Sequence, residues 1–182
     1  MQFRILGKTG LEVSLVSLGS GGPSQLGQNT GLTENDQDSL VRRALDLGVN
    51  FIDTSEGYGD SETILGRALV GIPRDSYSLA TKCFYKMPDG RIRDPKELAL
   101  SIDRSLQKLR TDCIDVMQFH VLNSQDYLEV IDRLYPVMDA ARQKGKIRFI
   151  GFSEQFKVEP DHRVVTMALE NHPQLWDTVM LK

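Results

Sequence analysis

The chain has 182 residues, of which 40% are hydrophobic and 26% are charged, and its formal net charge is -3. This composition indicates one soluble domain and gives no reason to expect binding to nucleic acid or to an anionic membrane. No run approaches the ~20 apolar residues of a membrane-spanning helix. The first residues are too polar for a secretory signal, so we expect a cytoplasmic protein.

The cysteines and histidines show no metal-binding pattern. Cys83 and Cys113 do not form a CxxC pair, and we expect both thiols to remain reduced. His120, His162 and His172 are not accompanied by HExxH or Cys/His spacing. A dedicated metal site is therefore not expected.

Short apolar runs recur along the chain after an N-terminal segment that alternates in hydropathy. Residues 3–13 alternate around Lys8-Thr-Gly10 and predict a short hairpin. Runs such as VNFID and IDVMQF are almost continuously apolar, which favours parallel strands that are covered on both faces. We expect strands over residues 15–20, 49–54, 77–82, 114–120, 146–153 and 177–181.

Helix signals follow each of these runs except the last. Thr33 with Asp36 predicts an N-terminal cap, and Asp94-Pro95 with Glu97 predicts another, with proline at the first helical position. Residues 127–144 carry one apolar stripe and are expected to form a single helix before Gly145.

A strand–helix alternation with a period of roughly 30 residues predicts right-handed βαβ units. An open doubly wound sheet would place a GxGxxG turn after its first strand, and the GSGGP segment at residues 19–23 lacks that spacing. The pattern therefore favours an α/β fold of the (β/α)8 TIM-barrel type.

Because a closed barrel needs about 250 residues, we expect an incomplete one with about six strands and five helices. We expect a single partial barrel domain over 1–182, with a capping hairpin in 1–14 and the six strands in 15–182.

Polar residues lie at or just after the ends of three successive expected strands. Asp53 ends the second strand, Tyr58 follows five residues later, Lys82 ends the third strand and His120 ends the fourth. Active sites of such barrels lie at the C-terminal ends of the strands, so these four side chains should meet at one mouth. Each has a simpler explanation: a helix cap, a loop anchor, a solvated lysine and a half-buried structural histidine. Their joint placement favours a shared functional site.

The chain resembles the aldo-keto reductase family in four segments. These are FIDTSEGYGDSE (51–62), ATK (80–82), MQFH (117–120) and IGFS (150–153). The resemblance implies a (β/α)8 barrel that uses NADPH (NADP⁺) to reduce an aldehyde or ketone to an alcohol. It also implies that Asp53, Tyr58, Lys82 and His120 are the catalytic residues.

The expected roles follow from the chemistry. Hydride arriving at a carbonyl carbon leaves an alkoxide, which needs a proton, and the resemblance implies that Tyr58 donates it. A tyrosine with a pKa of about 10 is a weak acid, and the ammonium of Lys82 would lower that pKa. Asp53 would keep Lys82 charged, and a neutral His120 would orient the carbonyl oxygen.

The resemblance also implies cofactor contacts at Gly21, Asp53, Ser153 and Glu154. The family has asparagine after the serine, and Glu154 in its place either accepts from the nicotinamide amide or begins the next helix. Phe84 and Val121 are expected to line the substrate pocket, and ordinary loop packing is the alternative.

The sequence is compatible with two functions. One is a carbonyl reductase. The other is a non-catalytic nicotinamide-binding accessory or regulatory subunit, or an inactive partial barrel. The intact set of four residues favours the reductase. We expect a small-molecule carbonyl compound as partner, no nucleic acid and no membrane, and self-association through the open barrel edge. We expect the chain to be part of a longer enzyme, with a second chain or a reduced relative as the alternatives.

Overall fold

The computed structural model describes residues 1–181 and shows an incomplete barrel. An antiparallel hairpin of β1 (Phe3–Ile5) and β2 (Glu12–Ser14) precedes a parallel sheet of six strands in chain order. The strands of this sheet are β3 (Leu18–Gly19), β4 (Phe51–Asp53), β5 (Ser78–Cys83), β6 (Ile114–Phe119), β7 (Ile147–Glu154) and β8 (Thr178–Leu181). Lys182, the last residue of the expected domain, lies outside the described residues.

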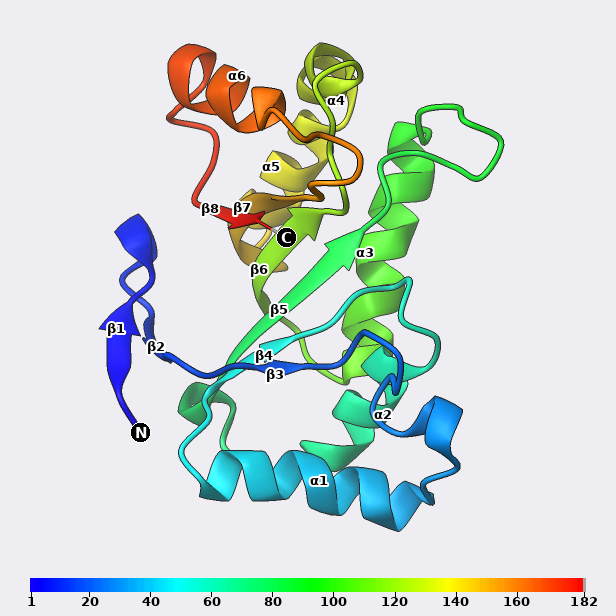
Figure 1. The fold of residues 1–182 in the computed structure, drawn as a ribbon, viewed down its shortest axis with the longest axis vertical. Helices are drawn as coiled ribbons and strands as arrows, with labels where there is room; N and C mark the ends of the chain where they lie inside the picture. The colour runs from blue at the N-terminus through cyan, green and yellow to red at the C-terminus, as the bar shows by residue number, and fades with distance from the viewer. Residues whose placement is uncertain (182) are drawn as a thin grey trace.

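Helices follow each strand from β3 to β7 and lie on the outer side of the curved sheet (Figure 1). They are α1 (Glu34–Asp46), α2 (Ser61–Ala68), α3 (Pro95–Leu109), α4 (Tyr127–Arg133), α5 (Tyr135–Gln143) and α6 (Arg163–Asn171). Short 3-10 helices cover Gly7–Thr9, Gln28–Thr30 and Arg74–Ser76. The five βα units and the sixth strand confirm the expected partial barrel.

The single helix expected over residues 127–144 is a wrong prediction. The chain forms two helices, and α5 begins at Tyr135 with Pro136 in its first turn. Proline has no N–H to donate and its ring clashes with the preceding turn, so α4 cannot continue through it. The apolar stripe persists across this break, which is why periodicity alone did not reveal it.

The expected helix caps are confirmed. Thr33 accepts the N–H of Asp36 and forms a capping box with it, and Asp94 and Glu97 form a second one before α3. The first strand is shorter than expected, because Leu15 and Val16 are exposed and only Leu18 and Gly19 pair with β4.

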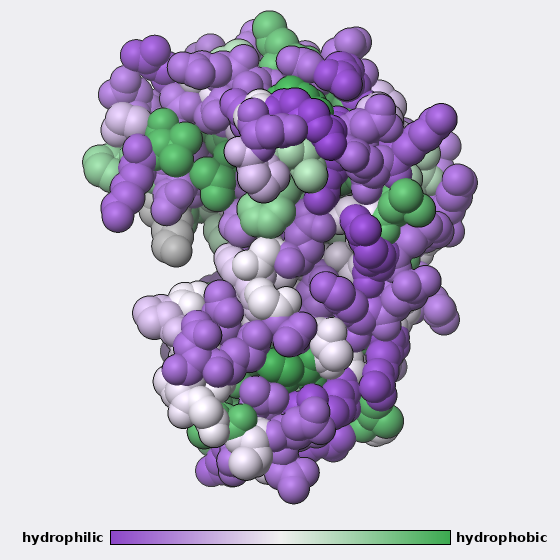
Figure 2. Space-filling view, turned by 90° about the vertical axis from the view of Figure 1, so that its right-hand side faces the viewer, coloured by the Kyte–Doolittle hydropathy of each residue, from purple (hydrophilic) through white to green (hydrophobic). Residues whose placement is uncertain are grey.

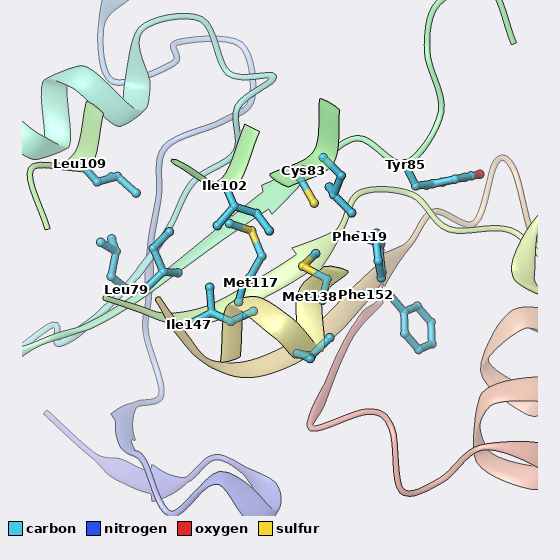
Figure 3. Packing of buried hydrophobic residues seen from close by; sticks show 14 of the residues in the cluster. Leu79, Cys83, Tyr85, Ile102, Leu109, Met117, Phe119, Met138, Ile147 and Phe152 are labelled. Atoms are coloured by element: carbon cyan, nitrogen blue, oxygen red, sulfur yellow. The ribbon is translucent and has the colours of Figure 1, made fainter. Parts of the chain in front are cut away.

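The outward-facing side chains of the sheet pack against the helices and form the main core. Met117 of β6, Ile102 of α3 and Met138 of α5 are fully buried in this layer (Figure 3). Residues of a β-strand alternate between its two faces. The neighbours of these core residues along each strand therefore point into the barrel.

A second apolar cluster fills the barrel interior and is closed by the hairpin. It consists of Leu11, Val13, Ala80 and Val116, with Leu6, Phe51 and Phe149 packed against it. Asp53 follows Phe51 by two positions, and Lys82 follows Ala80 by two positions. Strand alternation therefore places Asp53 and Lys82 inside the barrel, one layer above this cluster.

A buried carboxyl group joins α2 to the sheet. Glu62 is buried and accepts a hydrogen bond of 2.8 Å from the hydroxyl of Thr81, while its Oε2 has no hydrogen-bond partner among the described residues. Burial raises the pKa of Glu62, because removal from water disfavours the charged form.

We predict that Glu62→Gln will stabilise the protein increasingly as the pH rises from about 4 to 7. A raised folded-state pKa means that the carboxyl contributes stability when protonated and that this contribution is lost as the pH rises through the folded pKa. Urea unfolding of both proteins across this range measures the difference. The control is Glu170→Gln at an exposed site of α6. Equal pH profiles for wild type and Glu62→Gln would contradict the prediction.

Within residues 1–181 no helix is long and apolar enough to cross a membrane. The face shown in Figure 2 is largely hydrophilic, with apolar residues exposed in small, separate groups. Such scattered exposure is ordinary for a protein surface.

Candidate active site

An aspartate and a lysine form a buried ion pair inside the barrel. The Nζ of Lys82 lies 2.5 Å from Oδ2 of Asp53 and donates a second hydrogen bond of 3.0 Å to the carbonyl of Thr54. The side chain of Lys82 is only 1% exposed, which rules out a solvated lysine. Asp53 is no helix cap either, since α2 begins at Ser61 with Asp60 in the cap position.

Burial acts on both charges of this pair. It raises the pKa of Asp53 and lowers the pKa of Lys82, because removal from water disfavours the two charged forms more than their mutual attraction favours them. The Oδ1 of Asp53 is buried and has no hydrogen-bond partner among the described residues. Both pKa shifts therefore follow from the burial of the pair, and the mutual attraction of Asp53 and Lys82 offsets only part of this burial.

Tyr58 packs between this ion pair and His120. The Nζ of Lys82 lies 5.1 Å from the centroid of the Tyr58 ring, within the range of a cation–π contact. The rings of Tyr58 and His120 meet edge to face, with centroids 5.6 Å apart. The structure thus brings together all four residues that the sequence placed at this mouth.

The loop that carries Tyr58 is fixed by a neighbouring loop. Gln28 donates from Nε2 to the carbonyl of Tyr58 at 3.2 Å and accepts the N–H of Asp60 at 2.8 Å. Gly59 has a φ of +59°, and a Cβ there would lie 2.5 Å from Oε1 of Gln28, so this turn requires glycine. Gly21 lies against the other side of Tyr58, because a Cβ at Gly21 would approach its ring to 2.7 Å.

His120 is the first residue after β6 and is held on several sides. Its backbone N–H donates to the backbone carbonyl of Cys83 at 2.9 Å, and its ring Nδ1 lies 3.1 Å from the hydroxyl oxygen of Ser55. The ring of Phe84 stacks on the imidazole with a centroid distance of 5.2 Å and an interplanar angle of 21°. Phe84 therefore lies beside His120 at the mouth of the barrel.

Ser153 reaches the same mouth from β7, while the next residue turns away. The hydroxyl of Ser153 accepts the N–H of Val121 at 2.9 Å and holds this β-branched residue at a φ of +57°. Such a conformation is rare for valine. Glu154 faces the helices and pairs with Nδ1 of His162, so the structure does not bring its carboxyl group to the other four residues.

A buried ion pair that the sequence did not reveal joins two loops of the mouth. Glu56 accepts hydrogen bonds from the backbone N–H of Phe84 at 2.6 Å and from Arg93 at 2.7 Å, and a third from the hydroxyl of Ser101. The side chains of Arg93 and Glu56 are 8% and 14% exposed. Glu56 thereby ties the loop of Tyr58 to the loop of Phe84.

We predict that Glu56→Gln will lower the free energy of unfolding by about 3 kcal/mol. Glutamine keeps the oxygen that accepts from Phe84 but leaves the guanidinium of Arg93 buried without its countercharge. Urea unfolding measures the loss. The control is Glu129→Gln, which breaks an exposed pair with Arg133 and should cost less than about 0.5 kcal/mol. Equal losses of unfolding free energy in the two variants would show that the buried pair contributes no more to stability than an exposed one.

The residues that the sequence did not reveal are supports of the site. Ser55 and Glu56 lie inside the 51–62 segment, and their type alone suggested no role. Their partners His120 and Arg93 lie 65 and 37 residues further along the chain. Gln28 lies in a loop without any motif. Only the fold shows these pairings.

The chain has relatives among known proteins. The Aldo/keto reductase family model matches residues 17–174. The chain is 37% identical over 158 residues to L-galactose dehydrogenase of Arabidopsis thaliana, covering 84% of this chain and 48% of that protein. It is 36% identical over 161 residues to 6-dehydroglucose reductase of Novosphingobium aromaticivorans, covering 83% of this chain and 51% of that protein. The chain thus spans about half the length of these curated relatives.

The fold also resembles solved structures of aldo-keto reductases. The aldo-keto reductase AKR11C1 from Bacillus halodurans, in its holo form, superposes with a TM-score of 0.80 at 26% identity over 100% of this chain and 57% of that one. The family match covers most of the described chain, and it includes β3 to β7, which carry Asp53, Lys82, His120 and Ser153 at or beside their ends. The chain therefore belongs to the aldo/keto reductase family.

Proposed function

We propose that the protein is an NADPH-dependent oxidoreductase that reduces an aldehyde or ketone to an alcohol. One observation carries this proposal. The ammonium of Lys82, bound to Asp53, lies beside the ring of Tyr58, and the imidazole of His120 meets the same ring from another strand. A phenol, an ammonium and an imidazole at one barrel mouth form a proton donor with its activating and orienting groups.

The residues divide the chemistry among them. A bound nicotinamide supplies a hydride to the carbonyl carbon, and the oxygen must then gain a proton. Tyr58 donates that proton from its hydroxyl. Lys82 stabilises the phenolate that remains, since a positive charge beside a phenol favours its ionised form. Asp53 holds Lys82 in place, and His120 hydrogen-bonds the carbonyl oxygen and aims it at Tyr58.

Several residues of the mouth fit a nicotinamide cofactor. Ser153 accepts from the N–H of Val121 and retains its own hydroxyl hydrogen for a carboxamide oxygen. The Oδ1 of Asp53, which has no hydrogen-bond partner within residues 1–181, is an acceptor inside the barrel. Gly21 gives a side-chain-free surface beside Tyr58. Glu154 could contact the nicotinamide only if its bond to Nδ1 of His162 were broken. We therefore assign the contact with the carboxamide to Ser153.

The substrate is a small carbonyl compound that enters past Phe84 and Val121. Phe84 is 38% exposed and covers one face of His120, so its ring is available to an incoming apolar group. The two curated relatives are named for sugar substrates. The candidate substrates therefore include hydroxylated aldehydes beside simple aromatic and aliphatic ones.

The test is a cofactor oxidation assay. The protein is mixed with NADPH and an aromatic, an aliphatic or a sugar aldehyde, and the loss of NADPH absorbance is recorded beside the formation of the alcohol. We expect equal amounts of oxidised cofactor and alcohol with at least one aldehyde class. A protein that binds NADPH but forms no alcohol from any of the three classes would instead support the accessory-subunit alternative.

A further inference from the structure

Ser55 is a buried serine whose hydroxyl has three polar neighbours. Its oxygen lies 3.1 Å from Nδ1 of His120, 3.1 Å from the backbone nitrogen of Gly57 and 3.3 Å from the carbonyl oxygen of Lys82. The residue is 0% exposed, so water does not compete for these contacts.

The serine hydroxyl has a single hydrogen, and two of its neighbours can accept it. The N–H of Gly57 can only donate to the serine oxygen. The carbonyl of Lys82 already accepts the N–H of Glu56 at 3.0 Å, and its 3.3 Å distance from Ser55 exceeds the usual 2.5–3.0 Å of an O–H···O bond. The hydrogen of Ser55 is therefore best placed on Nδ1 of His120.

This assignment determines where the imidazole carries its own proton. A neutral imidazole has one N–H and one acceptor nitrogen, and the partner of one nitrogen fixes the state of the other. With Nδ1 accepting from Ser55, the proton lies on Nε2. Phe84 stacks on one face of the imidazole, and a backbone hydrogen bond from the N–H of His120 to the carbonyl of Cys83 fixes the backbone of His120. The ring is therefore held in this orientation.

We infer that Ser55 fixes His120 as the Nε2–H tautomer and is thus a positioning residue of the active site. Its effect on the reaction rests on the proposed function, because an Nε2–H donor is what a carbonyl oxygen requires. The tautomer itself does not depend on the reaction and is measurable in the chain without cofactor or substrate.

Two-bond ¹H–¹⁵N NMR spectra of the histidine rings test the inference directly. Wild type, Ser55→Ala and Ser55→Thr are labelled with ¹⁵N, and the other two rings are assigned with His162→Gln and His172→Gln. At neutral pH we expect the wild-type His120 ring to show an unprotonated Nδ1 and a protonated Nε2. Ser55→Ala should shift the tautomer ratio toward Nδ1–H by about tenfold, the effect of one hydrogen bond, and Ser55→Thr should retain the wild-type spectrum.

A protonated Nδ1 in wild type, or an unchanged ring in Ser55→Ala, would overturn the inference. If Ser55→Ala does not fold, the wild-type and Ser55→Thr spectra still decide which nitrogen carries the proton. In the reduction assay, Ser55→Ala should lower kcat about tenfold with little change in KM. An altered tautomer with an unchanged kcat would show that Ser55 does not position the reaction. A wild-type protein with the expected tautomer but no turnover would contradict the proposed function and leave the tautomer assignment intact.

Discussion

Replacing Tyr58 with phenylalanine should lower the kcat of carbonyl reduction by about 100- to 10,000-fold, which is the usual contribution of a positioned proton donor. The variant loses only the hydroxyl group. Its ring can keep the contacts with Lys82, His120 and Gly21, so the fold and the affinity for NADPH should be nearly unchanged. Steady-state kinetics and a fluorescence titration with NADPH measure the two quantities separately.

Tyr135→Phe is the matched control for this experiment. The hydroxyl of Tyr135 donates to the carbonyl of Leu175 at 2.9 Å, in the helix layer. Its loss should lower stability by about 1 kcal/mol and leave kcat unchanged. If Tyr58→Phe reduces the substrate at the wild-type rate, Tyr58 does not supply the proton.

Replacing Lys82 with methionine should abolish reduction and also lower the free energy of unfolding by about 3 kcal/mol. Methionine fills a similar volume, but it leaves the carboxyl of Asp53 buried without a countercharge. Burial already raises the pKa of Asp53, and removing the ammonium raises it further. A carboxyl with a raised folded-state pKa contributes stability only when protonated, so the loss should be greatest at neutral pH and should shrink toward pH ~4. Urea unfolding between these pH values measures it.

The double variant Asp53→Asn/Lys82→Met separates stability from catalysis. It contains no buried charge at this point, so we expect it to regain most of the stability lost in Lys82→Met. It should remain inactive, because no ammonium is left to stabilise the phenolate of Tyr58. Lys157→Met, at an exposed position, controls for the loss of a charge. Activity in the double variant would show that the ion pair serves folding alone.

The barrel could be predicted because its signals are local. Strand runs, the capping boxes at Thr33 and Asp94, and the glycine after α5 each depend on neighbours within a few residues. The break before Tyr135 was missed because Pro136 lies inside a stripe that stays apolar on both sides. A proline at the first turn of a helix and a proline that ends one differ only in context.

Three of the four residues of the site could be placed together from the sequence, because parallel strands bring their C-terminal ends to one mouth. The sequence thus located Asp53, Lys82 and His120 from their strands alone. It could not show that Ser55 meets His120 or that Glu56 meets Arg93, because these contacts depend on the paths of loops. Nor could it show that Glu154 turns toward His162. A shift of one residue at the end of a strand moves a side chain to the other face of the sheet, and the sequence does not define the strand end that closely.

The most direct measurement is the structure of the protein with NADP⁺ and a carbonyl compound bound together. We predict a carbonyl oxygen within about 2.6–3.2 Å of both the Tyr58 hydroxyl and Nε2 of His120, with Lys82 still paired to Asp53. A carbonyl oxygen bound away from these two atoms, or in contact with only one of them, would contradict the assignment of this mouth as the site of reduction.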